Sequence, residues 1–375
     1  MANVKLDDLL VFTRRAEVSD LHLTVGVPPV IRIDGELRAI EGFSPLMPPD
    51  TLALAQELLN EEQMAQLVAE REMDLSFGRP GAGRYRLNVY HQRGSIGLAI
   101  RVIRSEVPTI DDLQLPPITR EFAEADHGLV LVCGATGSGK STTIAAMIQH
   151  INTNLSKHII TIEDPIEFLY RHEKSIINQR QVYDDTNGFK EALRRVLRQD
   201  PDVILVGEMR DFESIEAALT ISETGHLVFA TLHTSDAATT VSRIVDVFPS
   251  TQQQQARVQL SVVLQGVMIQ QLLPRAKGSG RIMVQEILRA NVAVRSMIRD
   301  NEIHQISQVM ETHRREGMQT MNYALFEAFK RGDLTKEQCL NKSTNYEQMK
   351  SMLARAGAVG GAGPAGQISS RRPFG

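Results

Sequence analysis

The feature that most constrains the fold is a glycine-rich segment over residues 134–141. It reads Gly134-Ala135-Thr136-Gly137-Ser138-Gly139-Lys140-Ser141 and fits the pattern G-x-x-x-x-G-K-[ST] completely. An apolar run, 129–133, precedes it, and a helical pattern, 142–150, follows it. Glycines let backbone N–H groups turn inward around phosphate oxygens, and the N-terminus of the following helix adds positive potential. The segment therefore predicts a strand–loop–helix unit that binds the phosphates of ATP.

Two side chains of this segment have predicted roles of their own. Lys140 is expected to reach the β- and γ-phosphates, and the hydroxyl of Ser141 to ligate Mg²⁺. The predicted cofactors are therefore ATP and Mg²⁺. The predicted nucleotide-binding residues are Gly134, Ala135, Thr136, Gly137, Ser138, Gly139, Lys140, Ser141 and Thr142.

Further apolar runs predict the sheet to which this unit belongs. Candidate strands over 129–133, 158–162, 203–206 and 227–232 alternate with helical patterns. Nearly all-apolar strands that alternate with helices are typical of a parallel sheet that is buried on both faces. We therefore predict an α/β fold, with helical patterns again from about 251 to 348.

The segments before and after this core predict the division into domains. Residues 1–104 indicate a smaller α/β domain, with a hairpin turn at Asp34-Gly35, a helix over 50–72 and strands over 84–90 and 96–103. Three prolines place a linker at 105–120. The nucleotide-binding domain with its C-terminal helices then covers 121–350. The Gly/Ala-rich residues 351–375 are expected to form a disordered tail.

Two carboxylates follow predicted strands. Glu163 comes directly after 158–162, and Glu208 follows 203–206 through Gly207. Ligands in open α/β sheets bind at the carboxyl ends of the strands, so both are candidates for phosphate chemistry. We assign Glu208 to the Mg²⁺ shell and Glu163 to water activation, and the exchanged assignment stays open. Asp164 and Glu167 also fit a solvated turn with a helix cap, and for Asp164 this interpretation is as good as a functional site.

Two histidines bracket the predicted strand over 227–232. They lie at its opposite ends, which makes them poor partners for one metal ion. Only His233 lies at the carboxyl end, near the predicted nucleotide. We interpret His233 as a sensor that donates a hydrogen bond to the γ-phosphate, and His226 carries no assigned role.

Charge and cysteine content exclude several classes of protein. The chain has 41 Lys and Arg against 45 Asp and Glu, a formal net charge of −4, which argues against a nucleic-acid coat protein. Cys133 and Cys339 are the two cysteines, too few for a disulfide scaffold or a four-cysteine zinc site. No apolar run approaches the length of a membrane helix. The N-terminus carries Asp7, Asp8, Arg14 and Arg15, where a signal peptide needs an apolar stretch. We expect a cytoplasmic protein without membrane insertion or nucleic-acid binding.

Four stretches together resemble the secretion ATPase superfamily. Residues 134–141, 161–168, 198–211 and 224–234 are similar to its phosphate loop, Asp box, Walker B segment and His box, in the same order. Residues 19–23, 26–35, 293–300 and 317–320 resemble its branch of type IV pilus retraction ATPases. The resemblance covers about residues 5–350.

The resemblance implies a fold, a reaction and partners. It implies a PAS-like N-terminal domain, a RecA-like core and a homohexameric ring that hydrolyses ATP to disassemble pili in twitching motility. It also implies that the ring docks at the cytoplasmic face of the inner membrane, on a platform protein at the pilus base, together with a possible PilU-like paralogue. Arginines of the N-terminal domain would reach the neighbouring subunit's nucleotide. The candidates are Arg84, Arg86 and Arg101, of which Arg86 and Arg101 are assigned catalytic roles.

The segment 293–300 contains two arginines on which the resemblance places a function. Arg295 and Arg299 are four residues apart and share a helix face, and the resemblance implies that this face is a surface needed for retraction.

The alternative functions within the superfamily are those of a pilus assembly or type II secretion ATPase and of a PilU-like accessory retraction ATPase. The rivals outside it are a RecA-type DNA translocase and a nucleotide-gated binding protein without turnover. Salt-dependent DNA affinity and phosphate release would identify these last two.

Overall fold

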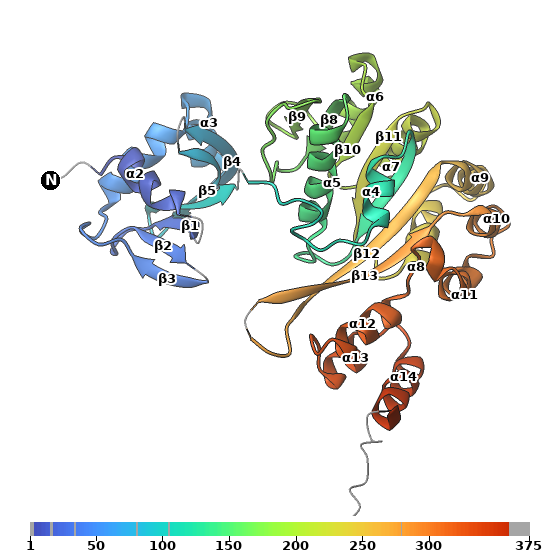
Figure 1. Ribbon diagram of the computed structural model, residues 1–375. Helices are drawn as coiled ribbons and strands as arrows, with labels where there is room; N and C mark the ends of the chain where they lie inside the picture. The colour runs from blue at the N-terminus through green and yellow to red at the C-terminus, as the bar shows by residue number, and fades with distance from the viewer. Residues whose placement is uncertain are drawn as a thin grey trace, which may run out of the picture. The chain divides into compact units, whose positions relative to one another are not determined.

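The computed structural model describes residues 4–15, 18–33, 35–79, 82–103, 106–278 and 280–359, with side chains described up to residue 356. The chain divides into two compact units. Figure 1 colours its elements from blue at the N-terminus to red at the C-terminus. The first unit comprises Met1–Thr109 and Ile148–Ala192, and the second comprises Ile110–Met147 and Leu193–Gly375.

The first unit contains a six-stranded antiparallel sheet in the order β3-β2-β1-β6-β5-β4. Its core is built from the residues that alternate inward along the strands, such as Leu21 and Leu23 on β1 and Tyr85 and Leu87 on β5. The elements are α1 (Leu6–Leu10), η1 (Val11–Arg14), β1 (Val18–Leu23), β2 (Val30–Ile33), β3 (Glu36–Ala39), α2 (Pro48–Leu58), α3 (Glu61–Glu70), β4 (Glu72–Arg79), β5 (Gly83–Gln92) and β6 (Ser95–Ile103).

Two sequence predictions for this part have different outcomes. The hairpin is confirmed, because Ile33 pairs with Glu36 across a two-residue connection; its Asp34 lies outside the described residues. The single helix over 50–72 is wrong. Leu59 is extended and ends α2, and the side chain of Asn60 then accepts a hydrogen bond from the backbone N–H of Gln63 and starts α3. A capping residue thus interrupts an apolar pattern that reads as continuous.

The second sheet has seven strands in the order β13-β12-β7-β11-β10-β8-β9. Strand β7 runs parallel to β11 and to β12, β10 parallel to β11, and β8 parallel to β9. Every residue of β7, β10 and β11 is buried, as the apolar runs predict. The strands are β7 (Gly128–Cys133), β8 (His158–Glu163), β9 (Ile176–Gln181), β10 (Val203–Val206), β11 (Leu227–Leu232), β12 (Leu264–Pro274) and β13 (Arg281–Arg289).

The region from 251 to 348 is not helical throughout, contrary to expectation. Strands β12 and β13 form a long antiparallel hairpin within it, from the pair Gly266 and Arg289 to the pair Pro274 and Arg281. The hairpin adds an antiparallel edge to an otherwise parallel sheet. The C-terminal helical part therefore begins after Arg289, with α10.

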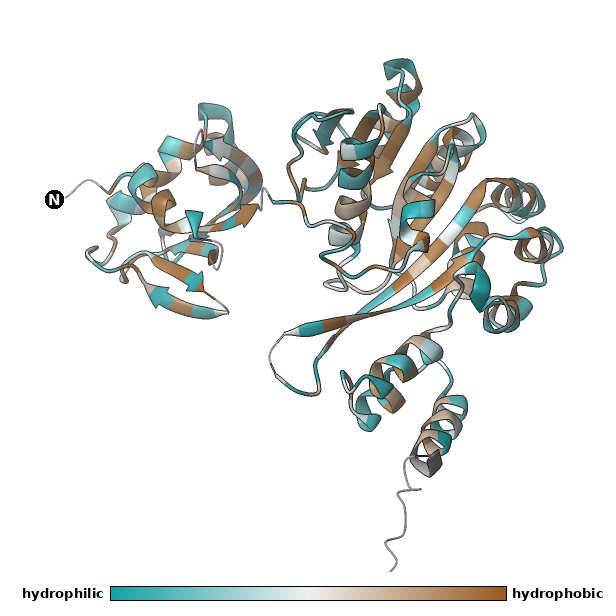
Figure 2. Cartoon of the chain, in the orientation of Figure 1, coloured by the Kyte–Doolittle hydropathy of each residue, from teal (hydrophilic) through white to brown (hydrophobic). Residues whose placement is uncertain are grey.

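Helices complete both units, and Figure 2 shows that they carry both polar and apolar residues, whereas the central strands are mostly apolar. Their bounds are α4 (Ile118–Ala123), α5 (Lys140–Asn154), α6 (Phe189–Val196), η2 (Leu197–Gln199), α7 (Phe212–Glu223), α8 (Ala237–Asp246), α9 (Gln253–Val263), α10 (Val292–Arg299), η3 (Ile303–Gln305), α11 (Ile306–Thr312), η4 (Arg314–Glu316), α12 (Met321–Lys330), α13 (Lys336–Lys342) and α14 (Tyr346–Val359). No described helix is long and apolar enough to cross a membrane.

The segments predicted as linker and tail are more ordered than expected. Within the predicted linker, Ile110 and Leu115 are buried against Ala146, and α4 already begins at Ile118. The predicted tail starts at 351, whereas α14 continues to Val359. The tail beyond Val359 lies outside the described residues.

A buried carboxylate joins three elements of the second unit. Glu286 on β13 accepts hydrogen bonds from the backbone N–H of Ala237 at 2.7 Å and of Met321 at 3.0 Å. These residues begin α8 and α12, so one carboxylate serves the N-termini of two helices. Burial raises the pKa of Glu286, and the two backbone hydrogen bonds act in the opposite direction.

Candidate functional site

The glycine-rich segment forms a loop between β7 and α5, where the sequence predicts it. Gly134 has φ +138°, and a Cβ atom there would lie 2.5 Å from the carbonyl oxygen of Gln270. Gly137 and Gly139 also have positive φ, at +77° and +91°. Glycine is therefore required for this loop path, both by the close approach of β12 and by the backbone conformation. Ser141 and Thr142 lie in the first turn of α5, at the positive end of its dipole.

Lys140 is folded over the loop that it follows. Its ammonium group donates hydrogen bonds to the carbonyl oxygens of Gly134 at 2.9 Å and Ala135 at 3.1 Å. The residue is 9% exposed, so its charge lies within the loop and not in bulk solvent. A cation held beside a glycine-rich loop at a helix N-terminus suits the β- and γ-phosphates of a nucleotide.

Sequence reasoning missed the support beneath this loop. Gln270 on β12 is 1% exposed, and its amide donates to the hydroxyl of Thr143 on α5 at 2.8 Å. The same residue presents its backbone carbonyl to Gly134. No local pattern indicates this contact, since it depends on the hairpin that the sequence does not predict.

Glu208 and His233 come together at the carboxyl ends of β10 and β11. The two strands are parallel neighbours, with Val206 opposite Ala230, so the residues that follow them lie side by side. Nε2 of His233 lies 3.2 Å from Oε1 of Glu208. Arg210, which sequence reasoning did not single out, donates to Oε2 of the same carboxylate at 2.7 Å. Both oxygens of Glu208 therefore have a positive or donating partner.

These partners keep Glu208 ionised. The hydrogen bond and charge of Arg210 and the interaction with His233 lower the pKa of Glu208, against an opposing effect of burial. His226 lies at the other end of β11, where its ring interacts with Thr224 and with the carbonyl of Ile221. The structure thus separates the two histidines as predicted.

Glu163 ends β8 in the first unit and has a different environment. Burial raises its pKa, while hydrogen bonds from Thr161 and Gln179 partly oppose that effect. The hydroxyl of Thr161 donates to Oε1 at 2.6 Å. A buried carboxylate with a raised pKa is a suitable proton acceptor, whereas an ionised one paired with arginine is a weaker base.

Comparison with known proteins identifies the family of this chain. A match to the family described as "Type II/IV secretion system protein" spans residues 97–341. The chain belongs to this family. It is a secretion ATPase with the α/β fold predicted from its sequence.

Individual relatives match the secretion ATPase along most of its length. The "Type IV pilus retractation ATPase PilT" of Pseudomonas aeruginosa is 43% identical and is covered over 98% of its length, with 90% of this chain. The "Type IV pilus ATPase PilU" of the same organism is 37% identical, with 89% of this chain and 87% of the relative covered. A crystal structure titled for the pilus retraction motor PilT and bound ADP has a TM-score of 0.87 at 46% identity, with 93% and 99% coverage.

A row of side chains crosses the N-terminal sheet of the secretion ATPase. Cross-strand pairs place Arg32, Asp20, Arg101, Arg86 and Ser76 side by side on β2, β1, β6, β5 and β4. The Arg101 side chain is 70% exposed and that of Arg86 44% exposed. Three arginines with a single aspartate make this row a basic stripe.

The third candidate arginine of the secretion ATPase is engaged within its own chain. Arg84 shares a strand face with Arg86, as predicted, but its Nη2 donates to Ser76 at 2.8 Å and to Gln181 at 3.3 Å. Both partners belong to the same unit as Arg84. Arg86 and Arg101 also have partners within the chain, Asp74 at 3.8 Å and Asp20 at 2.9 Å, so Arg84 differs from them in being less exposed.

Arg295 and Arg299 of α10 also have different surroundings. Arg295 donates through Nη1 to the carbonyl oxygens of Ser261 at 2.7 Å and of Val262, in the last turn of α9. Arg299 is exposed and interacts with Ser296 and Asp300 of its own helix. Of the two arginines on the helix face predicted from the sequence, Arg295 thus links α10 to α9, and Arg299 lies on the surface.

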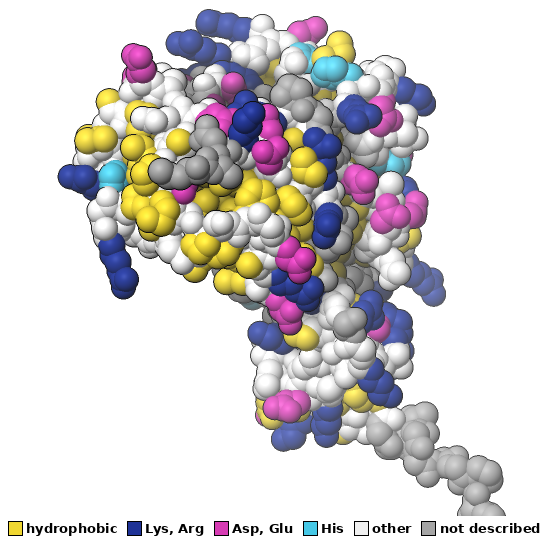
Figure 3. Space-filling model, turned by 90° about the vertical axis from the view of Figure 1, so that its left-hand side faces the viewer, with side chains coloured by type: hydrophobic (Ala, Val, Ile, Leu, Met, Phe, Trp, Pro, Cys, Tyr) yellow, Lys and Arg dark blue, Asp and Glu magenta, His cyan; other side chains and the backbone are white. Residues whose placement is uncertain are grey.

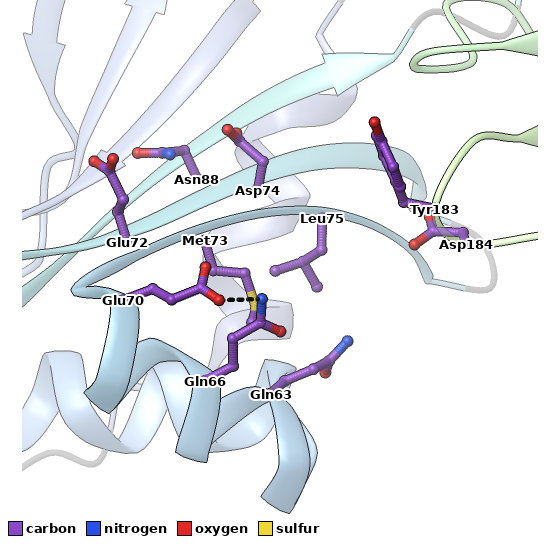
Figure 4. A pocket seen from close by; sticks show the side chains of 10 residues that line it. All are labelled: Gln63, Gln66, Glu70, Glu72, Met73, Asp74, Leu75, Asn88, Tyr183 and Asp184. Atoms are coloured by element: carbon purple, nitrogen blue, oxygen red, sulfur yellow. Dashed lines mark hydrogen bonds between the residues drawn. The ribbon is translucent and has the colours of Figure 1, made fainter. Parts of the chain in front are cut away.

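A polar hollow of about 500 Å³ in the first unit of the secretion ATPase contains none of the predicted site residues (Figure 4). Four carboxylates line it, those of Glu70, Glu72, Asp74 and Asp184. Gln66 from α3 donates to Glu70 at 3.1 Å across its floor. Negative charge on this lining disfavours phosphate groups, so this hollow is no nucleotide site.

Proposed function

We propose that the chain is an ATP-driven motor that retracts type IV pilus filaments by removing their subunits, the activity behind twitching motility. The observation that carries the proposal is the phosphate loop with Lys140, combined with 43% identity over nearly the full length of a pilus retraction ATPase. Bound ADP in the similar crystal structure supports nucleotide as the ligand of this loop.

The two carboxylates divide the chemistry of hydrolysis between them. Glu163, buried and with a raised pKa, accepts the proton of the attacking water. Glu208 stays ionised beside Arg210 and His233 and contributes negative charge at the loop end of the sheet. His233, whose Nε2 lies 3.2 Å from Glu208, acts as the sensor that donates a hydrogen bond to the γ-phosphate. Opposite pKa shifts support this assignment over the exchanged one.

The residues at the loop fit a magnesium ion held together with nucleotide phosphates. Ser141 and Glu208 offer a hydroxyl and an ionised carboxylate, the hard oxygen donors that Mg²⁺ prefers. No group of three His, Cys, Asp or Glu side chains among the described residues could hold a metal. That pattern suits an ion that takes most of its ligands from phosphate and water. When bound, Mg²⁺ supplies neutralising charge at the phosphates.

A ring of six identical subunits completes the site in this proposal. Arg86 and Arg101 would act on the nucleotide of a neighbouring subunit, and their exposure leaves both side chains accessible. Hydrophobic side chains also gather on the face seen in Figure 3. Exposed apolar residues of the N-terminal part, which we take to be a PAS-like domain, include Val11, Leu37 and Met47, a feature common at protein interfaces.

The remaining parts of the proposal concern location and partners. We place the ring in the cytoplasm, at the inner-membrane base of the pilus, on a platform protein. Arg299 on α10 is an exposed candidate for that contact. A second candidate function is that of an accessory retraction ATPase, supported by 37% identity with PilU over 89% of this chain.

Deletion in the host tests the proposal. Loss of the retraction motor should leave cells with abundant pili and no twitching, because assembly continues without removal. Cells without pili would instead identify an assembly ATPase. Pili that still retract, but with reduced force, would identify the accessory function. A matched strain that carries Lys140→Ala separates loss of nucleotide chemistry from loss of the protein.

A further inference from the structure

The surroundings of Glu163 contain two side chains that the proposed chemistry does not yet use. Thr161 on β8 and Gln179 on β9 are register partners in adjacent parallel strands. Glu163 lies two residues beyond Thr161 and so projects from the same face of the sheet. The hydroxyl of Thr161 donates to Oε1 of Glu163 at 2.6 Å, and Nε2 of Gln179 approaches the same oxygen at 3.4 Å.

Gln179 is itself fixed by backbone groups of the segment that follows Glu163. Its Nε2 donates to the carbonyl of Phe168 at 2.8 Å, and its Oε1 accepts from the N–H of Tyr170 at 3.0 Å. A primary amide has two N–H donors, so one can serve Phe168 while the other points to Glu163. The orientation of the amide is therefore set by the loop and not by the carboxylate.

Thr161 is a fixed donor for a different reason. The residue is fully buried, and the branched Cβ of threonine restricts χ1 within a strand. Two donors from two strands thus act on one oxygen of Glu163, and together they restrict rotation of the carboxylate plane.

We propose that Thr161 and Gln179 are positioning residues, which hold Oε1 of Glu163 so that the carboxylate meets its water in one orientation. The inference rests on the proposed role of Glu163 as the proton acceptor. Small displacements of a reacting group cost about 10²-fold in rate, so a loose carboxylate loses turnover without losing nucleotide.

The charged and titratable neighbours within the first unit do not replace these donors. Glu167 acts on Glu163 in two opposite ways, because its backbone N–H donates a hydrogen bond that lowers the pKa of Glu163 while its charge raises that pKa. Tyr170 also interacts with Glu163. The hydrogen bonds of Thr161 and Gln179 favour the ionised, proton-accepting form. Orientation and ionisation therefore depend on the same two side chains.

The test compares kcat and KM for ATP in full-length Thr161→Val and Gln179→Leu. We expect each to lower kcat about 10- to 100-fold, with KM and ADP affinity within about three-fold of wild type. Thr161→Ser keeps the hydroxyl and should return kcat to near the wild-type value. Asn178→Leu is the matched control, because Asn178 is the exposed neighbour of Gln179 on β9 and faces the other way.

Glu163→Gln separates failure of this inference from failure of the proposed function. If Glu163→Gln keeps wild-type turnover, Glu163 is not the proton acceptor and both ideas fall. If Glu163→Gln abolishes turnover while Thr161→Val and Gln179→Leu keep full kcat, only the positioning role is overturned. A fall in ADP affinity that matches the fall in kcat, or no rescue by Thr161→Ser, would also overturn it. Should Thr161→Val unfold, Gln179→Leu and Thr161→Ser still decide the question.

Discussion

Arg101 on β6 donates through Nε to Oδ1 of Asp20 on β1, at 2.9 Å, within a directly opposed cross-strand pair. Arg32 approaches the other oxygen of Asp20 at 3.8 Å from the far side. Asp20 is 9% exposed, whereas the Arg101 side chain is largely exposed. The aspartate thus holds one end of the Arg101 guanidinium, while most of that side chain is exposed.

This pair predicts a pH-dependent contribution to stability. Burial acts to raise the pKa of Asp20, but hydrogen bonds from Arg101 and Ser19 and the charge of Arg101 outweigh burial, so the pKa lies below its usual value. A carboxyl whose pKa is lowered on folding stabilises the protein above its unfolded pKa of about 3.9, and this stability disappears as pH falls through the folded pKa. Asp20→Asn should therefore lower stability by about 1–3 kcal/mol at pH 7 and by progressively less below about pH 4.

Urea unfolding followed by circular dichroism measures this difference, since the chain has no tryptophan for fluorescence. Glu41→Gln, which removes an exposed carboxylate with no hydrogen bond or ion pair among the described contacts, is the comparison for general charge effects. A difference between wild type and Asp20→Asn that stays constant from pH 7 to pH 3 would show that ionisation of Asp20 is not what stabilises the sheet.

Removing the ammonium group of Lys140 or the carboxylate of Glu208 should abolish ATP hydrolysis without unfolding the chain. We expect Lys140→Ala and Glu208→Ala each to reduce phosphate release at least about 10²-fold, because each removes charge at the phosphates or at their counter-ion. Lys342→Ala, at an exposed position of α13, is the matched control and should leave turnover unchanged. Turnover within a few-fold of wild type in Lys140→Ala would exclude a nucleotide motor.

The two arginines of α10 should have separable effects. Arg295→Ala removes hydrogen bonds to two carbonyl groups of α9 and should cost about 1–3 kcal/mol of stability. Arg299→Ala should change stability by less than about 0.5 kcal/mol, spare hydrolysis and impair twitching. Thermal unfolding, ATP turnover and colony spreading together measure these effects. If Arg299→Ala lowers hydrolysis and twitching equally, α10 contributes to the ATPase itself and not to coupling.

Mixed rings should recover activity that neither parent has. Lys140→Ala subunits keep their arginines, and Arg86→Ala/Arg101→Ala subunits keep their loop, so some interfaces in a mixed ring have both. Arginines supplied in trans contribute about 10³–10⁵ in rate, which makes partial recovery measurable. ATP turnover is followed against mixing ratio once subunit exchange has been verified. Activity that never exceeds that of the two parents would place these arginines within their own chain.

The central strands could be predicted because each of them is a run of consecutive apolar residues. The runs at 203–206 and 227–232 coincide with β10 and β11, and the phosphate loop fixes the end of β7. Such strands are apolar on both faces and need no knowledge of their neighbours. The positions of Glu163 and Glu208, each at the carboxyl end of a strand, follow from the same topology.

Strands β9, β12 and β13 of the second sheet could not be predicted, because their identity depends on long-range pairing. Strand β12 contains Gln265, Gln270 and Gln271 among apolar residues and directly follows helix α9, so its sequence also reads as amphipathic helix. Strand β9 is mostly polar and forms only against β8. The side-chain contacts of residues on these strands, such as Gln179 and Gln270, therefore could not be predicted from the sequence.

Glu286 connects the starting points of two helices of the second unit, α8 and α12. Helix α8 follows His233 closely, and α12 begins the C-terminal helices, yet both start on the same carboxylate. A shift of the loop after His233 that carries Ala237 away leaves Met321 as the remaining backbone partner of this pair, with half of the anchoring lost. The first turns of α8 and α12 therefore depend on one carboxylate, and the loss of Glu286 would leave the starts of both helices without this acceptor.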